Sequence, residues 1–281
     1  MTFPHNGPAS DVLCAFGVHN PNFVTKTALA TIWKVTRADG SQAALKCYAD
    51  PGMPGEGPGF SWLKSINGTG AARFYARHKG SALVEWLAGP SLGDVARGGD
   101  VEAADHRLVA TARLLHNAPA PPTPDMPLLT DWFRALREAQ LPPDLAELSR
   151  HNMCRSLSMA ETLLEAQTDL RPLHGDLHHD NIKSSARGDL AFDAKGIVGD
   201  RAYELANAFL NPVDTPQIVQ DRTRINRLAD IAAQAFDSHK ATVLDWACAH
   251  AALSNAWHLR DGGDPDFTVL NLLWAVRDES E

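Results

Sequence analysis

The chain has 281 residues, which is enough for two lobes that each bury a core. Its hydrophobic content of 44% and charged content of 21% are typical of a soluble globular protein. The formal net charge of -8 argues against a nucleic-acid partner, because phosphate contacts need clustered lysine and arginine.

The N-terminal sequence and the cysteines indicate the compartment in which the protein is expected. The N-terminal sequence lacks the basic region and apolar core of a signal peptide, and no apolar run approaches the roughly 20 residues that span a bilayer. The four cysteines form no C-x-x-C pair, and we expect reduced, buried thiols at Cys14, Cys47, Cys154 and Cys248. We therefore expect a cytoplasmic protein with no membrane partner; the sequence does not indicate an oligomeric state.

The first third of the chain predicts a small antiparallel sheet. Strand patterns occur in four segments: 23–35, 42–48, 73–78 and 82–86. The turn at Asp39 and Gly40 joins the first two segments. A short helix is compatible with residues 60–66, and strand signals stop near Leu87.

The rest of the chain is mainly helical in pattern. Apolar residues recur at helical spacing in seven segments: 103–117, 128–139, 145–166, 202–210, 217–236, 241–259 and 267–276. Strands followed by helices indicate an α+β protein with two lobes. We expect a small antiparallel β lobe that binds nucleotide at 1–87, and a larger helical lobe with the catalytic loop and substrate pocket at 88–281.

The stretch 173–196 carries the polar groups on which the functional prediction depends. Asp176 and Asn181 have the spacing of the base and the metal-binding asparagine in a kinase catalytic loop. Asp193 follows a short apolar run, which places its carboxylate at the end of a strand. Mg²⁺ prefers oxygen ligands such as Asn181 and Asp193, and Asp176 is then left to accept the proton of an acceptor hydroxyl.

A lysine on the predicted strand 42–48 supports this interpretation. Lys46 is flanked by apolar residues, a position from which an ammonium can reach nucleotide phosphates. A lone strand lysine more often discourages edge-to-edge aggregation. Its place upstream of the stretch 173–196 nevertheless favours the phosphate-binding role.

Three histidines leave a zinc metallohydrolase open as an alternative. His174, His178 and His179, with Asp176 and Asp180, resemble a cluster in which neutral imidazoles bind zinc. No second cluster supplies the remaining ligands at a recognisable spacing. We therefore expect His174 to be structural, with its ring bonded to the backbone of the loop.

The sequences LHGDLHHDNI at 173–182 and FDAKGIVGDRAYELANAFLNP at 192–212 resemble the aminoglycoside phosphotransferase family. Within it, they are similar to the aminoglycoside-6 (streptomycin) and hydroxyurea resistance kinase branch. The resemblance implies a two-lobed, protein-kinase-like fold. It also implies transfer of the γ-phosphate of ATP, with Mg²⁺, to a hydroxyl of an aminoglycoside-like or other small substrate.

The resemblance assigns roles within the catalytic stretch. Asp176 would be the catalytic base, and Asn181 and Asp193 would hold Mg²⁺. Asp200 matches a family aspartate that braces the catalytic loop, and we expect it to accept backbone N–H groups.

The resemblance also assigns the nucleotide contacts. Lys46 would bind the α- and β-phosphates, with Glu56 as its ion-pair partner. The backbone of Glu85, Trp86 and Leu87 would meet the purine. Glu56 follows Lys46 by only ten residues, so its helix would be short and the ion pair would depend on bound nucleotide.

The phosphate loop and the acceptor pocket leave alternatives open. The loop 25–31 over the phosphates contains no glycine, which leaves a non-catalytic, pseudokinase-like nucleotide-binding module as an alternative. The acceptor is undetermined, because one fold serves many substrates. Candidate acceptor contacts are an aromatic and several acidic residues of the helical lobe: Glu204, Trp257, Asp261, Asp264 and Asp266.

Overall fold

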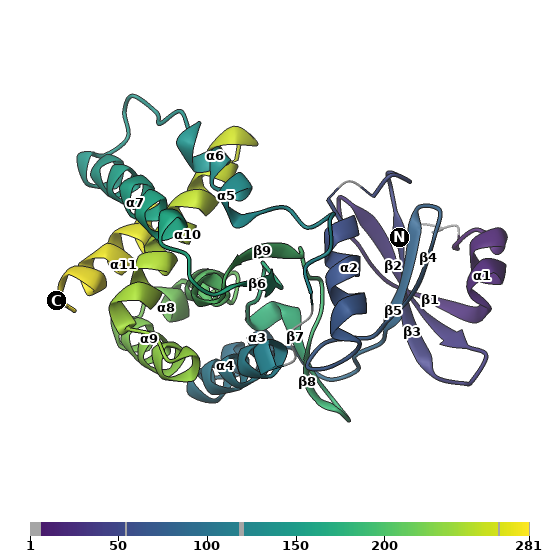
Figure 1. Cartoon of the computed structure of the whole chain (residues 1–281). Helices are drawn as coiled ribbons and strands as arrows, with labels where there is room; N and C mark the ends of the chain where they lie inside the picture. The colour runs from purple at the N-terminus through teal and green to yellow at the C-terminus, as the bar shows by residue number, and fades with distance from the viewer. Residues whose placement is uncertain (1–6, 54, 118–120, 264, 281) are drawn as a thin grey trace.

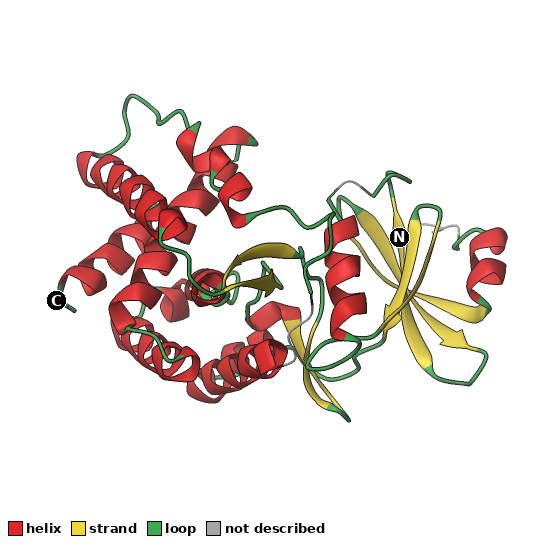
Figure 2. Ribbon diagram, viewed as in Figure 1, coloured by secondary structure: helices red, strands yellow, loops and turns green. Residues whose placement is uncertain are grey.

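The fold is taken from a computed structural model, which describes residues 7–53, 55–117, 121–263 and 265–280. A sheet-rich part and a helical part lie at opposite ends of the molecule (Figures 1 and 2). No helix within the described ranges is long and apolar enough to cross a membrane. Asp264, one of the proposed acceptor contacts, lies outside the described residues.

The N-terminal part contains a five-stranded antiparallel sheet with the order β1-β2-β3-β5-β4. Its strands are β1 (Val18–Lys26), β2 (Ala30–Arg37), β3 (Gln42–Tyr48), β4 (Phe74–His78) and β5 (Ser81–Glu85). Lys46 lies on the central strand β3, opposite Ile32 on one side and Ala82 on the other. The predicted antiparallel sheet is confirmed, with Lys46 on a strand that spans 42–48. The segment 23–35, predicted as one strand, divides instead into β1 and β2 at the turn 27–29.

The strand β1 begins five residues earlier than the pattern predicts. Its pairing with β2 is irregular between His19 and Asn22 and again between Phe23 and Thr25. Such bulges interrupt the two-residue alternation of a strand, so the sequence pattern does not reveal its first half.

The two faces of this sheet have different partners. Leu45 faces the helix α1 (Ser10–Phe16) and belongs to the small core on that side. Ala44 points to the opposite face and packs in the main core with the helix α2 (Gly57–Ile66). Because side chains alternate along a strand, Lys46 shares the α2 side. In Figure 1, α2 lies between the sheet and the helical part.

The C-terminal part is built around one long helix. Its helices are α3 (Leu92–Arg97), α4 (Val101–Asn117), α5 (Leu129–Trp132), α6 (Arg134–Arg137), α7 (Glu147–Glu165), α8 (Pro216–Val219), α9 (Arg222–Phe236), α10 (Lys240–Arg260) and α11 (Thr268–Asp278). The helix α10 contacts α7, α9 and α11 and is buried around most of its circumference. A helix buried on all sides forms the centre of a helical domain.

Three predicted helices are broken in the structure. The segment 128–139 divides into α5 and α6, and 202–210 forms the 3₁₀ turns η2 (Arg201–Tyr203) and η3 (Ala206–Leu210). The segment 217–236 divides into α8 and α9, because the Asp221 carboxylate caps a new N-terminus at Thr223. Apolar spacing persists across such short breaks, so periodicity alone predicted continuous helices.

Two small two-stranded sheets hold the stretch that contains Asp176 and Asp193. The strand β6 (Leu170–Leu173) pairs with β9 (Ile197–Asp200), and β7 (Ile182–Ser185) pairs with β8 (Gly188–Ala191). The 3₁₀ turn η1 (His179–Asn181) precedes β7. The proposed lobe boundary at Leu87 falls between the end of β5 and the start of α3.

The four cysteines are free thiols, as expected, but they differ in burial. Cys248 is buried and Cys47 is half-buried, whereas Cys14 and Cys154 are exposed. The prediction of buried thiols is therefore wrong for Cys14 and Cys154. Both lie on outward faces of helices, which apolar sequence neighbours do not reveal.

Candidate active site

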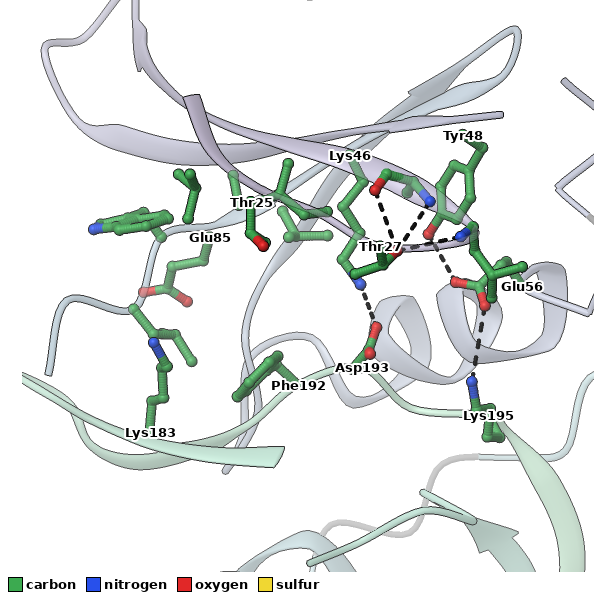
Figure 3. Close-up of a pocket in the computed structure, with 18 residues that line it drawn as sticks. Thr25, Thr27, Lys46, Tyr48, Glu56, Glu85, Lys183, Phe192, Asp193 and Lys195 are labelled. Carbon is green, nitrogen blue, oxygen red and sulfur yellow. Dashed lines mark hydrogen bonds and ion pairs between the residues drawn. The ribbon is translucent and has the colours of Figure 1, made fainter. Parts of the chain in front are cut away.

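A cavity of about 310 Å³ lies between the five-stranded sheet and the β7–β8 hairpin (Figure 3). Its roof is apolar and includes Val24, Ile32, Ala44 and Val84. Six charged residues line it: Lys46, Glu56, Glu85, Lys183, Asp193 and Lys195. Every residue predicted to contact nucleotide, including Trp86 and Leu87, therefore lines one cavity.

The Asp176 carboxylate is held by two asparagines. Asn207 Nδ2 donates to Asp176 Oδ1 at 2.7 Å, and Asn181 Nδ2 lies 3.3 Å from Oδ2. Asn181 also donates to the Asp176 carbonyl at 2.9 Å. Burial raises the pKa of Asp176, which favours a group that accepts a proton during a reaction. Sequence reasoning missed Asn207, although an asparagine within the apolar run ELANAFL is an available signal.

His174 fixes the start of the catalytic loop. Its Nδ1 accepts the Asp176 backbone N–H at 3.2 Å, so the ring proton is on Nε2, which donates to the Phe192 carbonyl at 3.0 Å. The side chain is fully buried, and burial lowers its pKa, which favours this neutral form. The predicted structural role of His174 is confirmed.

Glu204 holds the backbone of the same loop through hydrogen bonds. Its carboxylate accepts the backbone N–H groups of His174 at 3.2 Å and Gly175 at 3.3 Å, and it pairs with His116 at 2.9 Å. Glu204 is buried, so the expectation that it contacts an acceptor is wrong. Asp200, predicted to brace the loop, instead accepts the Thr168 N–H at 3.0 Å, ahead of β6.

The other histidines of the loop are engaged by protein groups. His179 Nε2 lies 3.0 Å from Asp105 Oδ1, and both side chains are fully buried. Asp105 also binds Arg224 and Arg227, from α9. His178 Nδ1 accepts the backbone N–H of Asp180 at 3.3 Å. Because the three rings face different partners, the geometry does not support the zinc site of the alternative prediction.

Lys46 and Asp193 form an ion pair across the cavity (Figure 3). Burial alone would raise the pKa of Asp193, but the Lys46 ammonium lowers it on balance. Asn181 uses its Nδ2 on Asp176, which leaves its Oδ1 for another partner. A carboxylate and an amide oxygen are the hard donors that Mg²⁺ prefers, so Asn181 and Asp193 fit that ion.

Glu56 does not pair with Lys46 here, a contact that was predicted to depend on bound nucleotide. It sits at the N-cap of α2, accepts the Tyr48 hydroxyl at 2.7 Å, and lies 3.9 Å from the Lys195 ammonium. Lys46 is paired with Asp193 in this arrangement, so the predicted Lys46–Glu56 contact is absent among the described ion pairs. Sequence reasoning did not identify Lys195 or Lys183 as lining residues.

The purine end of the cavity is defined by the chain after β5. Trp86 and Leu87 line it, and the Lys34 ammonium lies 5.3 Å from the centre of the Trp86 ring. The Glu85 carboxylate lies at this end of the cavity and binds Arg187 of the β7–β8 hairpin. This side-chain anchor fixes the segment whose backbone is expected to meet the base.

The glycine-free loop 25–31 closes on itself. Thr27 Oγ1 accepts the backbone N–H groups of Ala30 at 3.0 Å and Leu29 at 3.3 Å. Thr25 and Thr27 both line the cavity. A threonine hydroxyl therefore forms the turn for which a glycine would otherwise supply backbone freedom.

A second cavity, of about 340 Å³, lies in the helical part. It is lined by Asp131, Trp132, Arg134, Ala135, Glu138, Trp257 and Arg260. Trp257, an expected acceptor contact, packs edge-to-face on Trp132 with ring centres 5.4 Å apart. The other candidates are engaged locally, since Asp261 pairs with Arg260 and Asp266 accepts the Thr268 N–H.

Comparisons with known proteins agree with this geometry. The sequence profile of the aminoglycoside/hydroxyurea antibiotic resistance kinase family matches residues 17–262. The chain is 34% identical to streptomycin 3''-kinase of Klebsiella pneumoniae, over 75% of this chain and 78% of that one. It is 27% identical to streptomycin 6-kinase of Streptomyces griseus, over 81% of this chain and 74% of that one.

A solved structure shares the fold at low sequence identity. An aminoglycoside phosphotransferase in a ternary complex with ADP and hygromycin B superposes with a TM-score of 0.62 and 11% identity. The match covers 96% of each chain, so the likeness extends over both parts of the molecule. The two-lobed, kinase-like fold is thus confirmed, and the chain belongs to the aminoglycoside/hydroxyurea antibiotic resistance kinase family of ATP-dependent phosphotransferases that act on hydroxyl groups.

Proposed function

We propose that this kinase transfers the γ-phosphoryl group of ATP to a hydroxyl of streptomycin or a related aminoglycoside. The main support is the carboxylate of Asp176, which Asn207 and Asn181 orient while burial raises its pKa. The names of the two streptomycin kinases support the substrate class.

In this proposal the sheet lobe, 1–87, binds the nucleotide. The purine enters between the apolar roof and the backbone of Glu85, Trp86 and Leu87. Lys46 releases part of its contact with Asp193 and binds the α- and β-phosphates. Glu56 accepts the Tyr48 hydroxyl and lies 3.9 Å from the Lys195 ammonium, and its ion pair with Lys46 would form with bound nucleotide.

The helical lobe, 88–281, performs the chemistry. Asp176 accepts a hydrogen bond from the acceptor hydroxyl and takes its proton as the oxygen attacks the γ-phosphorus. Asn181 and Asp193 hold Mg²⁺, which when bound neutralises charge on the phosphate oxygens. Asn207 keeps the Asp176 carboxylate aimed, because it fixes Oδ1 at 2.7 Å.

We place part of the acceptor in the second cavity. Trp132 and Trp257 provide aromatic faces, and Asp131 and Glu138 add carboxylates. Cationic groups bind to aromatic faces and carboxylates, and streptomycin carries guanidinium groups. The Trp257 ring also packs edge-to-face on His250, whose Nδ1 lies 2.6 Å from the Tyr203 hydroxyl.

The test is phosphorylation of a defined panel. Purified protein is incubated with MgATP and streptomycin, kanamycin or hygromycin B, and products are identified by mass spectrometry. We expect monophosphorylated streptomycin, with Trp257→Ala raising the KM for streptomycin more than that for ATP. If ATP is neither bound nor consumed with any member of the panel, the proposed function is wrong.

A further inference from the structure

Two glycines allow the start of α2 to pack closely against the turn that follows Asp193. A Cβ atom on Gly59 would lie 1.9 Å from the Ala194 carbonyl oxygen, and one on Gly196 would lie 2.3 Å from the Pro58 carbonyl oxygen. Gly196 also has a φ of 68°, a conformation that disfavours other residues. This close backbone contact brings Glu56, at the N-cap of α2, to the side chain of Lys195.

The backbone of Lys195 is attached to the catalytic loop. Lys195 N and Gly196 N both donate to the His174 carbonyl, at 2.8 and 3.1 Å. The same His174 accepts the Asp176 N–H through its ring. A Cβ atom on Gly175, beside Asp176, would lie 3.4 Å from the Lys195 Cβ. Lys195 and Asp176 are therefore positioned by one histidine.

The Lys195 ammonium is loosely held at the edge of the cavity. Its side chain is 37% exposed, and its partner Glu56 lies 3.9 Å away, beyond hydrogen-bond distance. Figure 3 shows Lys195 below Glu56, at the Asp193 end of the cavity and away from Lys183 and Glu85. The ammonium therefore lies at the edge of the nucleotide cavity with no hydrogen-bond partner among the described residues.

We propose that Lys195 is a catalytic residue whose ammonium binds the γ-phosphoryl group during its transfer from the nucleotide to the acceptor. The inference rests on the proposed function and adds a group to it. In the step, the acceptor oxygen bonds to the γ-phosphorus while the bond to the β–γ bridging oxygen breaks. The electron pair of that bond leaves with ADP, and the hydroxyl proton passes to Asp176. A cation between the two sites stabilises the charge that the transferring oxygens carry.

The experiment uses nucleotides that differ by the γ-phosphate. Dissociation constants of Mg-ADP and Mg-AMP-PNP are measured by calorimetry for wild type, Lys195→Met, Lys195→Arg and the control Lys64→Met, whose side chain is exposed on α2. We expect Lys195→Met to weaken AMP-PNP binding about tenfold and leave ADP binding unchanged, because only AMP-PNP reaches the ammonium. Lys195→Arg should restore most of the affinity for AMP-PNP. Lys64→Met should bind both nucleotides like wild type.

Turnover provides the second measurement. Lys195→Met should lower kcat about 100-fold with little change in the KM for ATP, as expected when one donor to a developing charge is removed. Unchanged kcat and AMP-PNP affinity, or equal losses for ADP and AMP-PNP, would overturn the role of Lys195 while leaving the kinase intact. A wild-type protein that binds neither nucleotide would overturn the proposed function as well. Thermal melting of each variant separates these results from loss of folding.

Discussion

The catalytic loop and the glycine-free hairpin over the cavity are held in different ways. His174, Asp176 and His179 each bond to side chains or carbonyls from elements outside the loop, and two of their partners, Glu204 and Asp105, are fully buried. The hairpin between β1 and β2 is closed by Thr27, which bonds only within its own turn.

This difference in bonding corresponds to different proposed roles for the loop and the hairpin. A carboxylate must be aimed before it can accept a proton, and Asp176, the base that we propose, lies in a loop fixed by long-range buried contacts. The hairpin over the cavity is held instead by hydrogen bonds within its turn and by the Ala49 N–H, which the Leu29 carbonyl accepts at 2.8 Å. The exposed apolar side chains of Val24 and Leu29, both of which line the cavity, lie on this hairpin.

Removal of the base should have the largest effect. Asp176→Asn keeps the size of the side chain but cannot take the proton, so we expect kcat to fall about 100- to 10,000-fold. The KM for ATP should stay within a factor of about two, because Asp176 is not among the residues lining the nucleotide cavity. Steady-state kinetics with streptomycin provide the measurement, with the exposed Asp39→Asn as the matched control.

Loss of the orienting amide should have the next largest effect. Asn207→Ala removes the 2.7 Å hydrogen bond to Asp176. A hydrogen bond to a charged group contributes about 1.5–3 kcal/mol, so kcat should fall about 10- to 100-fold. Asn226→Ala, whose amide bonds only to the Arg222 carbonyl of its own helix, should keep wild-type kcat. A raised KM for ATP with unchanged kcat in Asn207→Ala would show that Asn207 does not act through Asp176.

The ionised Glu204, which bonds to the catalytic loop, should contribute to the free energy of unfolding. Burial alone would raise its pKa, but the hydrogen bond from His116 and those from the loop backbone lower it below 4.5 on balance. Glu204 therefore stabilises the fold above about pH 4.5, and this contribution is lost as the pH falls through its lower folded-state pKa. Glu204→Gln should cost about 1–3 kcal/mol at pH 7, because buried hydrogen bonds to a charged group are weakened.

The measurement for Glu204 is urea unfolding at pH 7, 4 and 3. The difference between wild type and Glu204→Gln should be largest at pH 7 and shrink toward pH 3. A difference that is constant over this range would show that the carboxylate is not ionised in the folded protein. Glu161→Gln, at an exposed ion pair with Arg137, is the matched control and should change stability much less.

A substitution in the hairpin between β1 and β2 should have the smallest effect on the kinetics. Thr27→Ala removes the hydroxyl that accepts two backbone N–H groups, a loss of about 1 kcal/mol, so the KM for ATP should rise a few-fold. Thr27→Ser retains the hydroxyl and should restore the wild-type KM. A fall in kcat with unchanged KM would contradict the separation between the hairpin and the catalytic loop.

Residues close together in the chain made much of the site predictable. Asp176, Asn181 and Asp193 lie within one stretch, and their spacing, taken together with the upstream Lys46, indicates the chemistry that we propose for them. Lys46 was predicted to bind phosphate because it lies on a strand upstream of the stretch 173–196, whereas a strand lysine alone more often discourages aggregation. The fold class followed from strands preceding helices, although short breaks such as the one at Asp221 leave no trace in helical periodicity.

Long-range contacts were not predictable in the same way. Glu204 was assigned to the acceptor pocket because the sequence does not show that His116, 88 residues away, buries its carboxylate. The approach of Glu56 to Lys195 was not predicted either, since the contact of Gly59 with the Ala194 carbonyl, which brings them together, is invisible in one sequence. Both contacts depend on which charges meet in three dimensions.

The most direct test of the account separates nucleotide binding from transfer in two variants. The ATP dissociation constant and the rate of phosphoryl transfer to streptomycin are measured side by side for Asp176→Asn and Lys46→Met. We predict that Asp176→Asn binds ATP like wild type and loses transfer, whereas Lys46→Met binds ATP about tenfold more weakly because a phosphate contact is removed. Transfer at the wild-type rate by Asp176→Asn would contradict the assignment of the base and with it the central claim.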